Sequence, residues 1–293
     1  MDLSHFAQKI GSNDPVTIVG LGTRGGAVPG VRTVSAPVGI ELIDAEDMVV
    51  VCGAATAVGD LQGALAQVGQ FVALPDGGTV GGALALGRSS VRRLGDGPVR
   101  ETLLQARFVG AQGQIVTAGG PTVKNVSGFD LCKLLVGSRG TLGFIAEVRL
   151  RTRPIAATSQ WFSSTANPWQ LQAALYRPVS ILWNGETTWV LLEGHRADVA
   201  GQATQLGLVD APGPPPLPTA HRWSLPPQQL LSMTTSLPGA PGFVAEIGVG
   251  IVHHSLPESP RDVIAGVQRL NQRLKDHFDP TGRLNPGVSA FDV

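Results

Sequence analysis

Three glycine-rich segments hold the residues of this chain that are best suited to bind a ligand through the polypeptide backbone. They are Pro75–Ala83, Val123–Asp130 and Gly137–Gly143. Glycine lets main-chain N–H groups approach a ligand closely and turn through positive φ without a clash at Cβ. One such turn by itself is typical of an ordinary loop. Because successive amides in these turns form anion-binding concavities, the three together predict a backbone that lies against a flat, phosphate-bearing cofactor.

A fourth glycine-rich segment, Gly20–Gly25, follows a short predicted strand and has the spacing G-x-G-x-x-G. This spacing is typical of Rossmann dinucleotide sites, where the loop opens a helix whose N-terminus holds the pyrophosphate. Here Pro29 and the glycines of Gly26–Gly30 break any helix directly after the loop. A Rossmann NAD site is therefore disfavoured.

Composition limits the classes of partner and cofactor. The chain has 293 residues, 43% of them hydrophobic, which suffices for a large core and two domains. Lys plus Arg and Asp plus Glu are both 22, so no net positive charge attracts nucleic acid. The two cysteines, Cys52 and Cys132, are too few to hold an iron–sulfur cluster and lack the CxxC spacing of zinc or redox sites. Electrons that leave one cofactor must then pass to another protein.

Strand and helix signals alternate through the first half, which indicates an α/β arrangement there. Pro154 ends the last strand and closes the predicted first domain. The expected strands are Val16–Val19, Met48–Cys52, Phe71–Leu74, Leu103–Val109, Gln114–Thr117 and Leu142–Arg153, and the expected helices are Val58–Val68 and Asp130–Val136.

The second half has the pattern of an antiparallel sheet with helices on one side. Pro212–Pro218 is expected to be a stiff extended connector. A helix is expected to open at Ser259–Asp262, with a cap and an early proline. The other expected elements are strands near Trp161 and Ile181, at Thr188–Leu192 and at Phe243–Val252, and helices from Asn167 and at Arg196–Leu206.

The glycine-rich segments in this order resemble the FAD-binding domain of the vanillyl-alcohol oxidase/p-cresol methylhydroxylase family, and within it the FAD-binding subunits of glycolate oxidase. The resemblance runs from Thr17 to about Pro154 and resumes at Phe278–Gly287. It implies an α+β fold with a two-part FAD-binding domain and a smaller antiparallel-sheet cap domain. The expected boundaries are 1–154 for the FAD-binding domain, 155–277 for the cap or substrate domain, and 278–293 for a tail that returns to the FAD site.

The resemblance also implies which residues approach FAD. In the family the first loop wraps the pyrophosphate with backbone amides, which needs no helix. Asp130 is expected to be a helix cap, and Lys124 stays open between a cofactor contact and a solvated charge. The implied cofactor-binding residues are Gly22, Thr23, Arg24, Gly25, Gly26, Thr79, Gly81, Gly82, Gly128, Gly137, Ser138, Thr141, Gly143 and Asn285.

The FAD is expected to be noncovalent. Relatives with covalent flavin attach it to a His or Cys, and no histidine occurs between His5 and His195. Cys132 lies inside a predicted helix, where a buried structural thiol is the common outcome.

The catalytic residues stay open. Hydroxy-acid dehydrogenases of the family carry the segment H-x-G-D-G-N-x-H, whereas this chain has Gly248–His254 in the corresponding region, so no metal site is expected. Adjacent histidines on a strand point to opposite faces, so His253 and His254 do not easily share one ion. Glu246, His253 and His254 are candidates for the base, and Arg177 or Arg222 for holding a carboxylate.

The resemblance implies an FAD-dependent oxidoreductase, or a subunit of one, that oxidises a small 2-hydroxy acid such as glycolate. The implied partners are a related flavin subunit and an iron–sulfur subunit. The alternative is a noncatalytic FAD-holding or assembly subunit. We expect a cytoplasmic location, because the chain has no apolar run of about 18 residues and Met1–Ile10 lacks the features of a signal peptide. The chain begins near the family's first helix, so we expect the family's opening strand to be missing or replaced.

Overall fold

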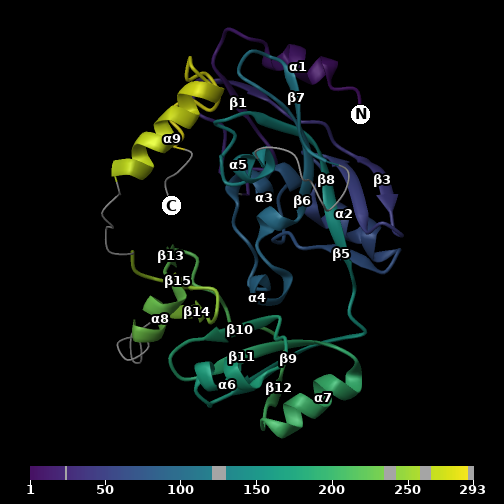
Figure 1. Cartoon of the computed structure of the whole chain (residues 1–293), viewed down its shortest axis with the longest axis vertical. Helices are drawn as coiled ribbons and strands as arrows, with labels where there is room; N and C mark the ends of the chain where they lie inside the picture. Colours follow the sequence, from purple (N-terminus) through teal and green to yellow (C-terminus); the bar gives the residue numbers. More distant parts are fainter. Residues whose placement is uncertain (24, 121–129, 234–241, 258–264, 290–293) are drawn as a thin grey trace. The chain divides into compact units, whose positions relative to one another are not determined.

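The chain folds into two compact units. The computed structural model describes residues 1–23, 25–120, 130–233, 242–257 and 265–289 (Figure 1). Unit 1 comprises Met1–Ser90, Pro98–Ile155 and Val263–Val293, and unit 2 comprises Val91–Gly97 and Ala156–Asp262. Two short segments thus group differently from the expected boundaries: 91–97 belongs with the second unit, and the last helix belongs with the first.

Unit 1 is built on two sheets. Strand β1 (Val16–Ile18) pairs in parallel with β2 (Arg32–Val34). The larger sheet has the order β3-β4-β8-β6-β7, with β5 paired to the end of β8, and its ladders are antiparallel. The even positions of β8 from Phe144 to Leu150 are buried, as their alternation predicts, and Ile145 and Glu147 on the other face are buried as well. The strands of the larger sheet are β3 (Ile40–Asp44), β4 (Val49–Gly53), β5 (Gln70–Val72), β6 (Leu103–Val109), β7 (Ile115–Gly119) and β8 (Phe144–Pro154).

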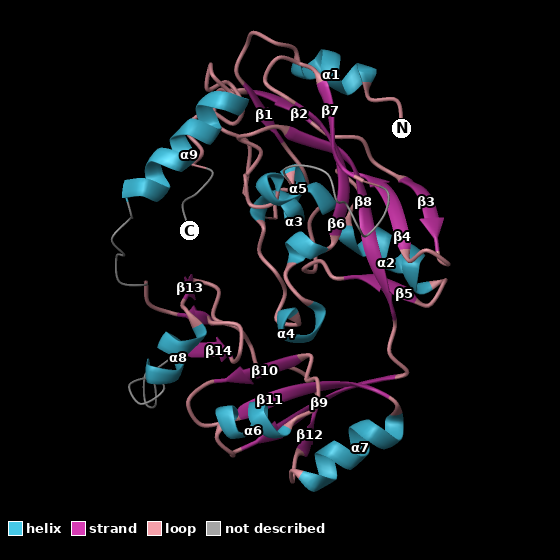
Figure 2. Ribbon diagram, in the orientation of Figure 1, coloured by secondary structure: helices cyan, strands magenta, loops and turns pink. Residues whose placement is uncertain are grey.

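Helices pack on the larger sheet and complete one hydrophobic core (Figure 2). Leu61 and Leu65 of α2 and Leu84 of α3 are fully buried in it. Phe6 and Ile10 of α1 join the same core. The helices of unit 1 are α1 (Ser4–Ile10), α2 (Val58–Ala66), α3 (Val80–Leu86), α5 (Leu131–Leu135) and α9 (Ala265–Phe278), with a 3-10 turn η1 at Val99–Glu101.

Unit 2 is a seven-stranded antiparallel sheet with the order β12-β9-β11-β10-β14-β15-β13. Helices α6, α7 and α8 cover one face, where side chains such as Leu171, Val199 and Leu230 join a second core. The strands are β9 (Thr158–Ser164), β10 (Ser180–Trp183), β11 (Thr188–Gly194), β12 (Val209–Ala211), β13 (His221–Ser224), β14 (Phe243–Glu246) and β15 (Ile251–His254), and the helices are α4 (Arg93–Asp96), α6 (Pro168–Ala174), α7 (Arg196–Gln205) and α8 (Pro227–Met233).

Two sequence expectations about elements are wrong. The single strand expected at Phe243–Val252 is a hairpin, because Gly248 and Gly250 take φ of +79° and +85° and turn the chain back. The segment expected to be a glycine turn as far as Gly82 becomes helix α3 from Val80 onward, because the Thr79 hydroxyl caps that helix. The helix start expected at Ser259–Asp262 lies outside the described residues.

Candidate cofactor-binding site

The first loop, between β1 and β2, presents open backbone. Gly22 and Gly25 take φ of +71° and +116°. A Cβ added at Gly22, Gly25 or Gly26 would meet no heavy atom within 4 Å. Thr23 forms an isolated bridge with Gly25. The loop is therefore shaped by glycine backbone, with open space at the Cβ positions of its glycines, which suits a phosphate-binding loop. Arg24, which the sequence also assigns to this loop, lies outside the described residues.

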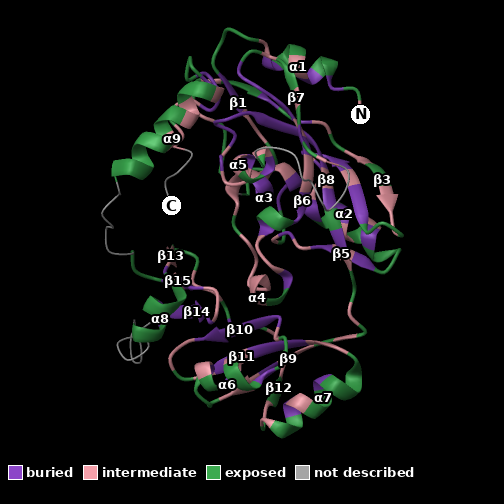
Figure 3. Ribbon diagram, viewed as in Figure 1, coloured by how far each residue is buried: buried purple, intermediate pink, exposed green. Residues whose placement is uncertain are grey.

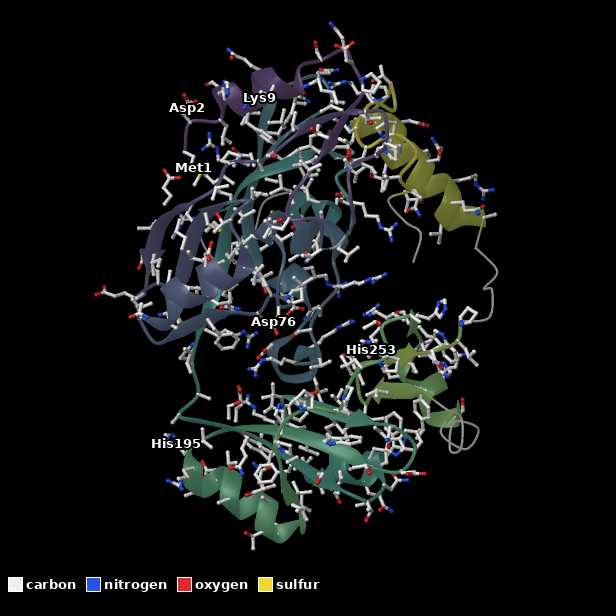
Figure 4. The ribbon with its side chains drawn as sticks, turned by 180° about the vertical axis from the view of Figure 1, so that it is seen from behind. Met1, Asp2, Lys9, Asp76, His195 and His253 are labelled. Atoms are coloured by element: carbon white, nitrogen blue, oxygen red, sulfur yellow. The ribbon has the colours of Figure 1, made fainter. Side chains whose placement is uncertain are left out.

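The second segment contacts the first. A Cβ added at Gly20 would lie 2.9 Å from Oγ1 of Thr79, so only glycine fits beside this threonine. Thr79 Oγ1 accepts a hydrogen bond of 3.1 Å from the Gly82 amide. The positive φ values fall on Gly77 and Gly78, ahead of the helix, and Asp76 lies on the loop just before them (Figure 4).

Gly81 and Gly82 therefore lie in α3 instead of a turn. The Gly81 amide donates to the Ala54 carbonyl at 2.7 Å, and a Cβ at Gly81 would lie 2.9 Å from that oxygen. Close packing of α3 explains this glycine. At Gly82 a Cβ would lie 3.0 Å from Thr79 Oγ1, so the helix cap explains why glycine occurs at position 82. Contact of either residue with FAD stays a prediction.

The third segment runs beside the C-terminal end of α3. The Gly137 amide donates to the Leu84 carbonyl, and the Arg139 amide donates to the Ala85 carbonyl, both at 2.9 Å. A Cβ on Gly137 itself, at φ +87°, would meet no heavy atom within 4 Å. Gly137 is thus the residue of this segment whose backbone borders open space.

The other predicted residues of this segment form its interior. The Thr141 hydroxyl donates to the Ser138 carbonyl at 2.7 Å, and both residues are buried. A Cβ on Gly143 would lie 2.5 Å from the ring of Phe108. These contacts give Thr141 and Gly143 a structural role, and their predicted approach to FAD remains untested.

The C-terminal segment contacts β1 and the segment that starts at Gly137. The Val16 amide donates to the Arg283 carbonyl and the Asn285 amide to the Val16 carbonyl, both at 2.9 Å, so the tail adds to the edge of β1. The Asn285 side chain bridges to the Arg139 carbonyl at 2.6 Å. Residues 18–26, 77–82, 137–140 and 283–285 are thus linked in one chain of contacts.

The glycine-rich sequence segment Val123–Asp130 cannot be placed in this arrangement. Gly128 and Lys124 lie outside the described residues. At the end of that segment Asp130 caps α5, where its Oδ1 accepts a hydrogen bond from the Lys133 amide at 3.3 Å, so its predicted role as a cap is confirmed.

The arrangement fits FAD. The fit depends on the loops of unit 1 at Gly22, Gly25, Gly77 and Gly137, where an added Cβ would meet nothing within 4 Å and the φ values are positive. Backbone amides in such loops bind the pyrophosphate of a dinucleotide without a counter-charge from side chains. These loops would hold the cofactor, and FAD would supply the redox chemistry.

Both cysteines are buried thiols. Burial raises the pKa of Cys52 to about 12, and burial, followed by the nearby Asp130 charge, raises the pKa of Cys132 to about 11. Because the thiolate is the reactive form, neither group is a good nucleophile at neutral pH. The Cys132 sulfur lies 3.8 Å from the Leu104 carbonyl, as expected for a structural thiol.

In unit 2, two of the three catalytic candidates form a pair. Nε2 of His253 lies 2.8 Å from Oε1 of Glu246, so the ring donates to the carboxylate (Figure 4 labels His253). Glu246 is 3% exposed. Arg222 is directly opposite His253 in the β13–β15 register. A carboxylate that orients an imidazole is the arrangement of a general base.

The third candidate, His254, has a structural environment. Its ring stacks on Trp223 at 4.4 Å between centroids and lies near Phe243. Its Nδ1 accepts a hydrogen bond from the Leu256 amide at 2.8 Å. Burial, followed by the charge of His221, lowers the pKa of His254 below its ordinary value of 6.5. As alternation along the strand predicts, the two adjacent histidines therefore have separate surroundings.

Arg92 forms an ion cluster that the sequence alone does not reveal. Its guanidinium binds both oxygens of Glu193, at 2.9 and 3.0 Å, and its Nε binds Asp96 at 2.8 Å. The cluster ties α4 to β11 within unit 2. The Arg92–Asp96 spacing of four residues was a possible signal, but the bond to Glu193, 101 positions away, was not.

Arg177, proposed from the sequence as a carboxylate anchor, is exposed and lies over the ring of Tyr176 at 5.7 Å. Among the residues that the structure describes, no three His, Cys, Asp or Glu side chains are grouped to hold a metal ion. No helix in the described part of the chain combines the length and apolarity that a membrane span requires.

Residues 6–119 match the FAD binding domain family. The chain is 29% identical to glycolate oxidase subunit GlcE of Escherichia coli, over 85% of this chain and 84% of the relative. It is 39% identical to the D-lactate dehydrogenase of Archaeoglobus fulgidus over 46% of this chain, which corresponds to only 32% of that relative.

Solved structures agree on the fold. A structure of alkyldihydroxyacetonephosphate synthase superposes with a TM-score of 0.67 at 14% identity, covering 97% of this chain and 74% of the other. With the helices and antiparallel sheets described above, this confirms the predicted α+β fold of FAD-binding domain and antiparallel-sheet unit. Residues 6–119 thus carry an FAD-binding domain of the p-cresol methylhydroxylase type, and along most of its length the chain is similar to a glycolate oxidase subunit.

Proposed function

We propose that this chain binds one FAD noncovalently in unit 1 and takes part in the oxidation of a small 2-hydroxy acid such as glycolate, passing the electrons to partner subunits. The observation that carries the proposal is the linkage of four segments around open glycine backbone at Gly22, Gly25, Gly77 and Gly137. The similarity to a glycolate oxidase subunit along most of both chains supports the substrate class.

Partner subunits are part of the proposal. The relative is named as a subunit, and this chain has only two cysteines, both buried. Because a cluster of iron and sulfur needs about four cysteine ligands, this sequence does not itself supply one for onward transfer. We propose that the partners are a related flavin subunit and an iron–sulfur subunit. We also propose a cytoplasmic location for the assembly.

Oxidation of a 2-hydroxy acid needs a base for the hydroxyl proton and a cation for the carboxylate. When bound, FAD would supply the hydride acceptor. Of the three catalytic candidates we assign the base to His253, because Glu246 orients its ring, and we assign Glu246 a positioning role. Arg222, opposite His253 on the neighbouring strand, is the proposed cation.

A visible absorption spectrum of the purified chain tests the cofactor. A flavin spectrum whose chromophore is released by acid precipitation is expected. A yellow pellet over a colourless supernatant would disprove noncovalent binding, and a colourless protein that FAD cannot reconstitute would disprove the site.

Anaerobic mixing with glycolate or D-lactate tests the reaction. We expect slow or no bleaching of the flavin by the isolated chain and faster bleaching once partner subunits are added. His253→Gln in the assembled complex should slow bleaching by about 10²-fold or more, the usual contribution of a general base. Rapid bleaching by the isolated chain, with fast reoxidation in air, would show a self-sufficient oxidase instead.

The second candidate function is a noncatalytic FAD-holding or assembly subunit. The observation that favours it is that Gly248–His254 lacks the family's H-x-G-D-G-N-x-H motif. Full turnover of the assembled complex with His253→Gln would select this function over the catalytic one.

A further inference from the structure

The side chain of Asn285 uses both ends of its amide within the protein. Its Oδ1 accepts a hydrogen bond from the Ile18 amide at 3.1 Å, and its Nδ2 donates to the Arg139 carbonyl at 2.6 Å. The residue is 7% exposed. Packing beside the Arg139 carbonyl is tight, because a Cβ at the next residue, Gly140, would lie 2.8 Å from Nδ2.

The two groups that Asn285 bridges belong to different glycine-rich segments. Ile18 ends β1 and stands two residues before Gly20, where the first loop begins. Arg139 lies in the segment Gly137–Gly143 and has φ of +51°. One short side chain thus spans the gap between the two backbone segments that the proposed FAD site requires.

The backbone of Asn285 is held in a conformation that suits this span. Its φ is +46°, in the left-handed region that asparagine tolerates better than most residues. Its own amide donates to the Val16 carbonyl at 2.9 Å, which fixes the tail along β1.

A buried ion cluster anchors the tail just before Asn285. Asp279 accepts hydrogen bonds from the amides of Arg283 and Leu284 and from Nζ of Lys275. The Arg283 guanidinium donates to the carbonyls of Ile10 at 2.6 Å and of Ala111 at 2.8 Å, among others. Asp279 and Arg283 are each 2% exposed. Because the polar groups of this network have hydrogen-bond partners, the network holds the backbone next to Asn285 in place.

We propose that Asn285 is a positioning residue, not a ligand of FAD: its side chain is a brace that sets the spacing of the first glycine loop and the Gly137–Gly143 segment. The inference depends on the proposed FAD site. It differs from the role expected for Asn285 from the sequence, because both polar ends of the side chain already have protein partners.

Two variants separate the brace from a backbone effect. Asn285→Gly keeps the positive φ without strain and removes the side chain. Asn285→Asp keeps the size and the acceptor for the Ile18 amide but sets a carboxylate against the Arg139 carbonyl. Met48→Gly is the matched control, because Met48 has φ of +53° in unit 1, in the turn between β3 and β4.

The measurements are hydrogen–deuterium exchange of the apoprotein and FAD titration followed by flavin fluorescence. In both Asn285 variants we expect faster exchange of peptides that cover 18–26 and 137–143, without FAD present. We also expect the Kd for FAD to rise about 10-fold or more, since Asn285→Gly loses both hydrogen bonds and Asn285→Asp replaces the bond to Arg139 with a repulsive contact. Met48→Gly should change neither.

Three results would overturn the brace. A higher Kd with unchanged exchange would make Asn285 a direct ligand. Faster exchange with an unchanged Kd would show that the contact stabilises the two segments without affecting FAD binding. If neither the exchange nor the Kd changes, Asn285 does not position the two segments. If the unaltered chain binds no FAD, the proposed function fails, and the exchange measurement alone then decides whether Asn285 holds the two segments together.

Discussion

The two units encode their candidate sites in different parts of the polypeptide. In unit 1 the site is made of main-chain groups: glycines with positive φ and open space beside their Cα atoms. In unit 2 the notable groups are side chains, namely the Glu246–His253 pair and the cluster around Arg92.

Buried residues run through the sheets of both units (Figure 3). Both units also hold buried carboxylates with ion-pair partners, namely Asp279 in unit 1 and Glu246 and Asp96 in unit 2. A buried charge is tolerated only when it is paired, whereas an open glycine loop needs no counter-charge. At the candidate sites, substitutions that add a Cβ should therefore do most harm in unit 1, and substitutions that remove a charge should do most harm in unit 2.

The largest effect is expected from Gly81→Val in unit 1. Its Cβ would lie 2.9 Å from both the Ala54 carbonyl oxygen and the Ala54 Cβ, so α3 cannot stay in place. We expect a loss of about 3 kcal/mol of unfolding free energy and loss of FAD binding, measured by thermal unfolding and flavin retention. The control is Gly63→Ala in α2, where an added Cβ meets nothing; it should stabilise by about 0.5–1 kcal/mol. A stable, flavin-bound Gly81→Val would contradict the comparison.

Arg92→Met tests the charged side of the comparison. It leaves Asp96 and Glu193 without their shared cation, and because Arg92 is 28% exposed we expect a loss of about 2 kcal/mol in denaturant unfolding. Arg93→Met is the control, since no ion-pair partner for Arg93 is found among the described residues.

The same variant has a pH signature. Burial opposes the charge on Glu193, but hydrogen bonds from Arg92 and Ser159 outweigh it and lower the pKa of Glu193 below its ordinary 4.5. A lowered folded-state pKa adds stability above pH 4.5 that is lost as the pH falls. The difference between the unaltered chain and Arg92→Met should therefore shrink below pH 4.5, and a constant difference would argue against the ion cluster.

Thr79→Val should have a smaller effect. It keeps the shape of the side chain but removes the oxygen that accepts the Gly82 amide, which costs about 1 kcal/mol for a helix cap. Because this oxygen lies beside Gly20, we also expect weaker FAD binding in an equilibrium titration. Thr79→Ser should restore both quantities; failure of the serine to do so would point to packing by the methyl group.

The smallest effect concerns His254. Burial lowers its pKa, so the unfolded chain takes up the proton first as the pH falls. Stability from this group is complete above pH 6.5 and declines below it. His254→Phe keeps a stacked ring beside Trp223 and should flatten this decline in unfolding curves at several pH values. His5→Gln, at an exposed position of α1, is the control. If the stability of His254→Phe declines below pH 6.5 as much as that of the unaltered chain, the decline comes from other groups.

Much of the fold follows from local sequence. The hydrophobic alternation of β8 and the caps at Asn167 and Asp130 are set by neighbouring residues, and the structure has them as expected. The glycine loops are also recognisable in the sequence, because a positive φ restricts the residue type at that position. The hairpin at Gly248 and the helix at Val80 were missed, since glycine marks a turn, a close contact or a cap equally well.

The sequence by itself determined the glycine loops, because they depend on residue type and short spacing, and the resemblance that these loops carry implied the α+β fold and the returning tail. Only the tertiary structure decided which residues meet. Glu246 reaches His253 through the register of one hairpin, and Arg92 reaches Glu193 across 101 positions. Asn285 bridges Ile18 and Arg139 from the far end of the chain. Such contacts depend on strand register and chain closure, which are set by the packing of the whole core and leave no local pattern.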